Sequence, residues 1–275
     1  MQETKRNVTK ENDLQRIKEL RLMDDDFFSE ALDGKTEAVE YILNTILERD
    51  DIKVKSTKAQ VEYKSATKRS IKLDIQAEDV HGRLMDIEIQ RSDRGSGVRR
   101  ARFHSSMIDR ALLSKGDDFE DLVDTYVIFI TEKDKFGMGI PLYHIERKIS
   151  EMDNALFGDG AHILYVNGEY RNLEHPVGSL MHDFNCKDAK DMVNPLLAEE
   201  VRYLKETEGG RSQMSRILEE MRNEVAEKAK AEGNHEKAVN TALKMIAKKY
   251  EAEEIAEITG LSLEEVRKLE ENQKG

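Results

Sequence analysis

Acidic side chains and two glutamines stand at alternate positions within residues 71–90, and apolar side chains fill most of the positions between them. This alternation, broken near Gly82, predicts an antiparallel β-hairpin. A three-residue loop that ends at Gly82 places Asp74 opposite Glu88, with Gln90 two residues further along the same face. Directly opposed side chains have Cβ atoms about 5 Å apart, and two carboxylates that close repel each other unless a proton or a cation lies between them.

A hard divalent cation suits such a pair, because Mg²⁺ prefers oxygen ligands. We therefore predict that Asp74 and Glu88 bind a metal ion, with Mg²⁺ as the first choice, and that Gln90 orients a water molecule. The alternative interpretation is a hairpin with one solvated face, which produces the same alternation. In that case the carboxylates are exposed and have no chemical role.

The order of a strand with Asp74, a hairpin and a strand with Glu88-Ile89-Gln90 resembles the PD-(D/E)xK nuclease superfamily. More narrowly, it resembles the PD-(D/E)xK family transposases, or recombination-promoting nucleases, in which a glutamine often replaces the lysine of the motif. Leu73 stands where the motif has proline. The similarity extends over residues 21–149, and a weaker similarity covers residues 259–262.

This resemblance implies a restriction-endonuclease-like α/β fold, with a mixed sheet flanked by helices and a helical C-terminal tail. It also implies a metal-dependent DNA endonuclease that hydrolyses phosphodiester bonds with Mg²⁺ or Mn²⁺, linked to recombination or transposition. Because Gln90 carries no charge, the metal or an arginine such as Arg100 must supply the stabilisation that the usual lysine gives. The alternative function is a catalytically inactive nuclease-like module that binds nucleic acid or a protein partner.

Two further metal ligands follow from the resemblance. One is the backbone carbonyl of Ile89, and the other is a glutamate on the first core helix. A stripe of apolar side chains predicts this helix at residues 35–48. Glu40 borders the stripe and is the first choice, and Glu37 is the second. An ordinary surface glutamate is the competing interpretation for both.

Basic residues gather around the predicted hairpin. The chain has a net charge of −12, but residues 53–115 have a net charge of +7. A helix predicted at residues 99–114 carries Arg99, Arg100 and Arg102, which we expect to bind DNA phosphates because guanidinium groups donate paired hydrogen bonds to them. The alternative is that these cations only solvate the surface. We interpret His104 on the same helix as a packing or surface residue.

The remaining pattern predicts an α/β sheet covered by helices. Residues 125–131 form a continuous apolar run, typical of a strand buried on both faces. The acidic run of residues 24–26 is interpreted as a helix start, where carboxylates are favourable, and Asn167-Gly168 predicts a hairpin turn. Further strands are expected at residues 52–63, 140–144 and 162–166.

We expect a nuclease-like domain at residues 1–195 and a charged helical region at residues 196–275. Helix breaks are predicted at Gly209-Gly210 and Gly233-Asn234. Residues 251–271 read as helix, turn and helix, but their net charge of −6 argues against a DNA reader, so we favour a packing or partner-binding role. A small core is expected from Ile255, Ile258, Leu261, Val266 and Leu269.

The chain contains one cysteine, Cys186, which excludes an intrachain disulfide and favours a reducing compartment. We find neither a signal peptide nor a transmembrane span, so a cytoplasmic protein without membrane contact is expected. DNA is the expected partner, and a homodimer is compatible with the sequence.

Overall fold

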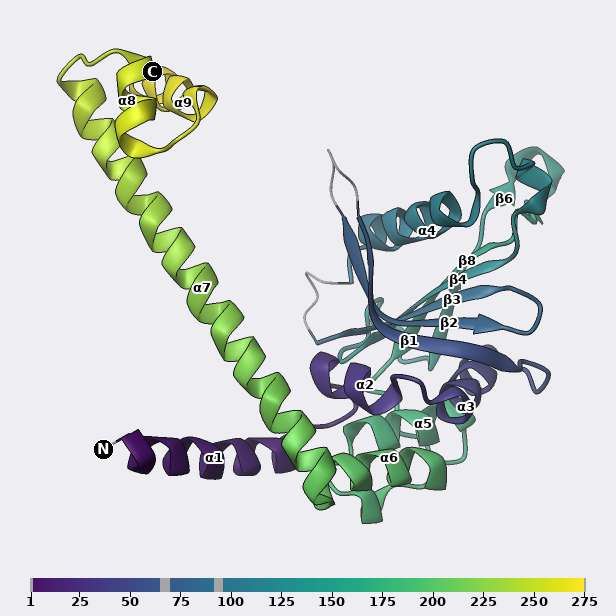
Figure 1. Ribbon diagram of the computed structural model, residues 1–275. Coiled ribbons are helices and arrows are strands. Elements are labelled where there is room, and N and C mark those ends of the chain that lie inside the picture. The colour runs from purple at the N-terminus through teal and green to yellow at the C-terminus, as the bar shows by residue number, and fades with distance from the viewer. Residues whose placement is uncertain (1, 65–69, 92–95, 275) are drawn as a thin grey trace. The chain divides into compact units, whose positions relative to one another are not determined.

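The computed structural model describes residues 2–64, 70–91 and 96–274 (Figure 1). Contacts group the chain into two units, Met1–Ser215 and Arg216–Gly275. None of the described helices has the length and apolar character that a membrane span requires. The α-helices are α1 (Gln2–Glu19), α2 (Asp25–Leu32), α3 (Thr36–Ile46), α4 (Val98–Leu112), α5 (Pro176–Asn185), α6 (Pro195–Glu206), α7 (Glu208–Ala247), α8 (Ala252–Thr259) and α9 (Leu263–Lys274).

The first unit is built on a six-stranded mixed sheet, with strand order β1-β2-β3-β4-β8-β5. Strands β1 to β3 are antiparallel, β4 pairs in parallel with β3 and β8, and β5 returns antiparallel to β8. The small strands β6 and β7 form a separate hairpin. The strands are β1 (Val54–Tyr63), β2 (Ile71–Asp79), β3 (Leu84–Gln90), β4 (Thr125–Thr131), β5 (Leu142–Ile145), β6 (Lys148–Ile149), β7 (Ala155–Leu156) and β8 (Ala161–Asn167).

The β2–β3 hairpin has the predicted register. Gln76 pairs with Asp86, and the Asp79 N–H donates to the Arg83 carbonyl at 3.1 Å, which closes a three-residue loop. Gly82 ends this loop with a φ of 79°, a left-handed conformation that a residue without Cβ adopts most easily. The hairpin prediction is therefore confirmed, including the residue that makes the turn.

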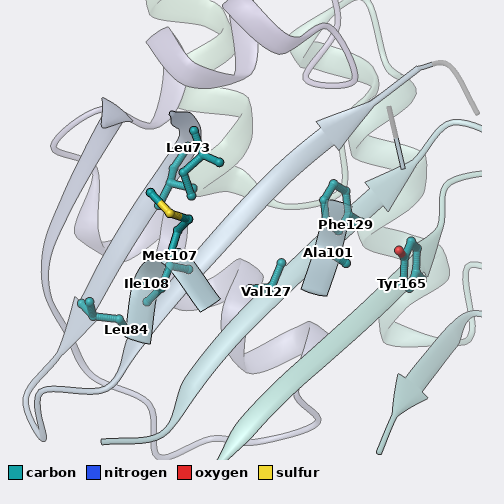
Figure 2. Packing of buried hydrophobic residues seen from close by; sticks show 9 residues of the cluster. Leu73, Leu84, Ala101, Met107, Ile108, Val127, Phe129 and Tyr165 are labelled. Carbon is teal, nitrogen blue, oxygen red and sulfur yellow. The ribbon is translucent and has the colours of Figure 1, made fainter. Parts of the chain in front are cut away.

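Strand β4 occupies the middle of the sheet, and all seven of its residues are buried, as the apolar run predicted. Helix α4 crosses one face of the sheet and packs on it through a common apolar cluster (Figure 2). The rings of Phe129 and Tyr165 stack at 5.5 Å within this cluster. The cluster consists of Ile71, Leu73, Leu84, Ala101, Met107, Ile108, Val127, Phe129 and Tyr165.

The parallel register places Asp86 beside Val127 and Glu88 beside Phe129. Paired residues of neighbouring strands point to the same face, so both acidic side chains lie on the face that α4 covers. Helices α2, α3, α5 and α6 lie together on the other side of the sheet (Figure 1). Helix α6, where the expected boundary at residue 196 falls, packs against α2 and α3 within the first unit.

Two sequence predictions about turns are wrong. Asn167 ends β8 and forms a turn closed by the Tyr170 N–H, but the chain continues towards α5 and not into a returning strand. The break expected at Gly209-Gly210 does exist, at Thr207 between α6 and α7, two residues before Gly209. The break expected at Gly233-Asn234 does not, because α7 runs unbroken from Glu208 to Ala247. Gly210 has another role, because a Cβ atom there would lie 2.1 Å from the Tyr203 carbonyl oxygen. A glycine inside a helix costs only about 1 kcal/mol, which 40 residues of helix tolerate.

The second unit has a small apolar core formed by the C-terminal part of α7 with α8 and α9. Ile255, Leu261 and Val266 are buried in it, and Leu269 packs against them. Gly260 ends α8 with a φ of 73°, and Ser262 and Glu265 form the expected capping box at the start of α9. Ile258, which was expected in this core, is 59% exposed.

The two isoleucines of α8 provide a matched test of this core. Replacing buried Ile255 with alanine should destabilise the unit by roughly 2–4 kcal/mol, because it removes packed methylene groups and leaves a cavity. Replacing exposed Ile258 with alanine should change stability by less than about 0.5 kcal/mol. Hydrogen exchange of the α8 and α9 amides in the full chain measures both effects. Equal loss of protection in the two variants would contradict this packing.

Candidate metal and nucleic-acid site

Asp74 and Glu88 lie side by side on the β2–β3 hairpin, and each carboxylate accepts a hydrogen bond from a backbone N–H of the other strand. The Asp74 N–H donates to Glu88 Oε1 at 3.0 Å, and the Ile89 N–H donates to Asp74 Oδ2 at 2.9 Å. Asp74 is 7% exposed and Glu88 is fully buried. The alternative of a solvated hairpin face is therefore wrong, because both carboxylates are buried.

Asp86 and His104 extend the pair to a buried cluster. His104 Nδ1 lies 3.1 Å from Asp86 Oδ2 and 3.9 Å from Glu88 Oε1. The His104 ring packs against Phe129, so the interpretation of His104 as a packing residue is correct in part. Its contacts with the carboxylates were not predicted. Within the described part of the chain, Asp86 Oδ1 is buried without a hydrogen-bond partner. This oxygen is a candidate metal ligand by its chemistry.

Asp25 brings a fourth carboxylate from the first turn of α2. Its side chain is within hydrogen-bonding reach of the Asp74 side chain, so the two must share a proton or a cation. Ser29, one turn further along α2, donates to the Asp74 carbonyl at 3.4 Å and accepts from Gln60 Nε2 at 2.6 Å. The expected helix start at this acidic run is correct, but the contact with Asp74 was not foreseen.

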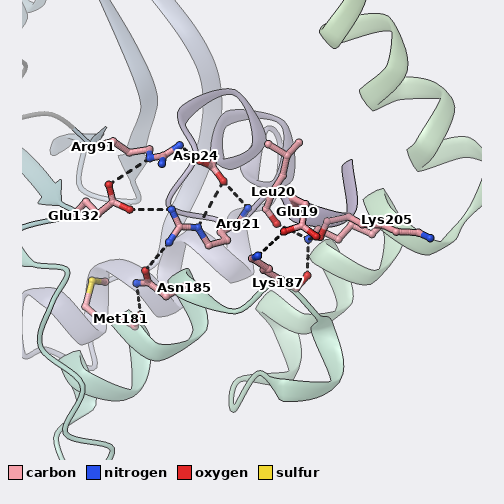
Figure 3. Close-up of polar contacts among 11 residues, drawn as sticks. Glu19, Leu20, Arg21, Asp24, Arg91, Glu132, Met181, Asn185, Lys187 and Lys205 are labelled. Atoms are coloured by element: carbon pink, nitrogen blue, oxygen red, sulfur yellow. Dashed lines mark hydrogen bonds and ion pairs between the residues drawn. The ribbon is translucent and has the colours of Figure 1, made fainter. Parts of the chain in front are cut away.

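A network of ion pairs fixes the start of α2 next to the sheet (Figure 3). Arg91, directly after β3, donates to Asp24 Oδ1 at 2.6 Å. Arg21 donates to Glu132, directly after β4, at 2.9 Å and to Asn185 of α5 at 3.1 Å. The network therefore ties the ends of two central strands to the residue that precedes Asp25.

Burial makes all four carboxyl groups weaker acids than usual, and repulsion between carboxylates adds to this for Asp74, Asp86 and Glu88. Burial and the charges of Glu88 and Asp25 raise the pKa of Asp74 to about 9. Burial and the charge of Asp86 raise the pKa of Glu88 to about 8. Burial also raises the pKa of Asp86, with a contribution from the Asp74 charge, and the pKa of Asp25. At neutral pH the cluster must therefore hold protons or a cation.

The cluster fits a divalent cation by the chemistry of its donors. One ligand atom each from Asp86, Glu88 and His104 lies within 4.8 Å of the others, and Asp74 adjoins Glu88. Carboxylate oxygens are the ligands that Mg²⁺ and Mn²⁺ prefer. The free oxygen of Asp86 adds a ligand that the sequence analysis did not include, although Asp86 lies two residues before Glu88 on the same face.

A second group of potential ligands, His182, Asp183 and Cys186, lies at the end of α5. Its polar atoms already have protein partners. The Asp183 carboxylate accepts the Val193 and Asn194 N–H groups at 2.7 and 2.8 Å, and His182 Nε2 lies 3.0 Å from the Asp191 carbonyl oxygen. This group therefore caps the start of α6, and the cation is better assigned to the cluster on the sheet.

The structure does not bring the helix glutamate to this site. Glu40 accepts from Lys53 Nζ at 2.7 Å and from the Val54 N–H at 3.1 Å. Val54 pairs with Asp79, five residues along β2 from Asp74, which corresponds to about 16 Å. Glu37, the second choice, is exposed. The predicted role of Glu40 thus lacks geometric support, and Asp25 is the helix carboxylate that reaches Asp74.

Gln90 is half-buried at the end of β3, two residues beyond Glu88 on the same face. The three arginines predicted to bind DNA differ in their positions on α4. Arg100 donates to Glu88 Oε2 at 3.0 Å and to His104 Nε2 at 3.2 Å. Arg99 lines a groove together with Arg100, and Arg102 is exposed outside it.

The Arg100 contact also defines the protonation of the neutral His104 ring. An arginine Nε–H can only donate, so His104 Nε2 accepts and the ring proton lies on Nδ1. That proton points to Asp86 Oδ2, which lies 3.1 Å away. Asp86 is thus oriented by a donor on one oxygen, and its other oxygen remains free for a ligand.

A mixed sheet with acidic side chains on adjacent central strands, flanked by helices, defines a restriction-endonuclease-like nuclease fold. A family model of PD-(D/E)XK nuclease family transposases matches residues 26–175. The match covers more than half of the chain, and the protein belongs to this family, as the motif around Asp74 and Glu88 indicated. Neither a curated protein nor a solved structure matches the chain.

Proposed function

We propose that the protein is a DNA endonuclease that depends on Mg²⁺ or Mn²⁺, hydrolyses phosphodiester bonds and acts in recombination or transposition. The family supports a nuclease or transposase role with a nucleic-acid substrate. The observation that carries the proposal is the cluster of Asp74, Asp86 and Glu88, which are buried together, with the Arg100 guanidinium 3.0 Å from Glu88 Oε2. A cluster of this kind must hold protons or a cation, and a divalent cation bound there supports metal-dependent phosphodiester hydrolysis.

In this proposal Asp74, Asp86 and Glu88 hold the cation, and Asp25 and the Ile89 carbonyl are additional ligands. When bound, the metal polarises the scissile phosphate and lowers the pKa of a coordinated water. Gln90 accepts a hydrogen bond from the attacking water and orients it. Arg100 can turn from Glu88 to a phosphate oxygen, because its side chain is 38% exposed.

Plasmid nicking at low salt tests the proposal. The wild-type chain should nick supercoiled DNA with Mg²⁺ or Mn²⁺ and should lose this activity completely in EDTA, because the buried carboxylates cannot by themselves activate water beside an anionic phosphate. Cutting that persists in EDTA would place the chemistry elsewhere. Tight DNA binding that is independent of metal, without cutting, would favour the inactive nucleic-acid-binding module.

A further inference from the structure

A groove of about 680 Å³ opens beside the carboxylate cluster, between α4 and the beginning of β2. Two residues connect the groove with the carboxylate cluster. Arg100 and His104 both line the groove, and Arg100 contacts Glu88 while His104 contacts Asp86. Its volume is within the range of sites that enclose a small ligand. A molecule in this groove therefore lies next to the proposed metal position.

The groove is rich in positive charge. Lys72 and Arg99 line it, and within the described residues neither of them makes an ion pair. Gly97, the N-cap of α4, also lines it and offers no side chain to cap the first amides of this 15-residue helix. The positive end of a helix, together with two cations, favours a phosphate group.

Phe103 is the unusual member of this lining. It is 36% exposed, and it follows Arg99 by one helical turn, so the ring and the guanidinium lie on the same side of α4. Phosphate contacts alone do not need an aromatic ring. An exposed ring between cations is typical of surfaces that bind single-stranded nucleic acid, where bases stack on aromatic side chains.

We propose that this groove binds an unpaired nucleotide of the DNA substrate beside the scissile phosphate, with the base stacked on Phe103 and the phosphate held by Lys72 and Arg99. In a continuous duplex each base is covered by its neighbours, so the ring finds no free face. The preferred substrate is therefore DNA with an unpaired segment. The location of the scissile phosphate rests on the proposed nuclease function.

Fluorescence anisotropy in EDTA tests the binding, because no cleavage is expected without metal. The probes are a labelled 12-nucleotide oligo(dT) and a fully paired duplex of the same length, at one fixed salt concentration. Replacing Phe103 with alanine should weaken binding of the single strand on the order of tenfold and leave duplex binding nearly unchanged. Replacing Phe103 with tryptophan should preserve it, because that ring also stacks.

Phe119→Ala is the matched control, since Phe119 is 80% exposed and does not line the groove. The inference fails if Phe103→Ala leaves the single-strand affinity within twofold, or if it weakens single strand and duplex equally. Binding that depends on Phe103 without any cleavage would overturn the nuclease function and leave the groove assignment intact. Cleavage of paired and unpaired DNA alike that depends on the carboxylates but not on Phe103 would overturn the groove assignment and leave the nuclease function intact.

Discussion

Replacing Glu88 with glutamine is expected to lower metal-dependent DNA cleavage by about a thousandfold or more. The amide keeps the shape of the side chain and can still accept the Asp74 N–H, but it cannot contribute a charge to a cation. Asp74→Asn should have a similar effect for the same reason. Nicking rates at saturating Mg²⁺ or Mn²⁺ measure both.

Glu78→Gln is the matched control for these variants. Glu78 is also a hairpin glutamate, but it is partly exposed and pairs with Lys55. The Glu78→Gln variant should cleave DNA at nearly the wild-type rate. If Glu88→Gln cuts normally, the catalytic centre is elsewhere. If Glu78→Gln is also inactive, the hairpin has been damaged and the comparison says nothing for the cluster.

The metal-free protein should lose stability as the pH rises from about 5 to 9. In the unfolded chain, Asp and Glu lose their protons near pH 4. In the folded chain, Asp74 keeps its proton to about pH 9 and Glu88 to about pH 8. Ionisation therefore favours the unfolded state across this window, by up to about 1.4 kcal/mol per pH unit for each such group. Below pH 4 both states are protonated and the penalty disappears.

Urea unfolding in EDTA at several pH values measures this effect, and the difference between wild type and Glu88→Gln isolates the Glu88 contribution. We expect Glu88→Gln to be the more stable protein at pH 8 by a few kcal/mol, with the two converging towards pH 4. Mg²⁺ should stabilise the wild type more at pH 8 than at pH 5, because metal ligands must be deprotonated. A difference that does not vary with pH would contradict the buried, repelling cluster.

The sequence was sufficient to predict the hairpin and the pairing of Asp74 with Glu88. Alternation with period two assigns each side chain to a face, and Gly82 marks the turn, so the register depends only on neighbouring residues. Asp86 was on the same face by the same rule. Its role emerged only with the parallel pairing of β3 and β4 and the cover of α4, which bury it beside His104.

Asp25 and Glu40 show what local patterns cannot provide. Both are acidic residues on helices that precede the sheet, and the helical periodicity of each segment was readable. Which of them meets Asp74 depends on how α2 and α3 dock, and the docking of α2 is fixed by Arg91 and its partners from distant parts of the chain. Contacts of this kind have no signature in a single short window.

The central position of β4 has a consequence for the order of folding. The β2–β3 hairpin is local and can form early, while its carboxylates are still hydrated. Strand β4 pairs with β3 about 40 residues away in sequence, and such distant contacts form slowly. The dehydration of Asp86 and Glu88 is therefore delayed until β4 and α4 close over them. The burial of these carboxylates therefore opposes the closure of the sheet, and a bound cation would offset that cost as well as complete the site.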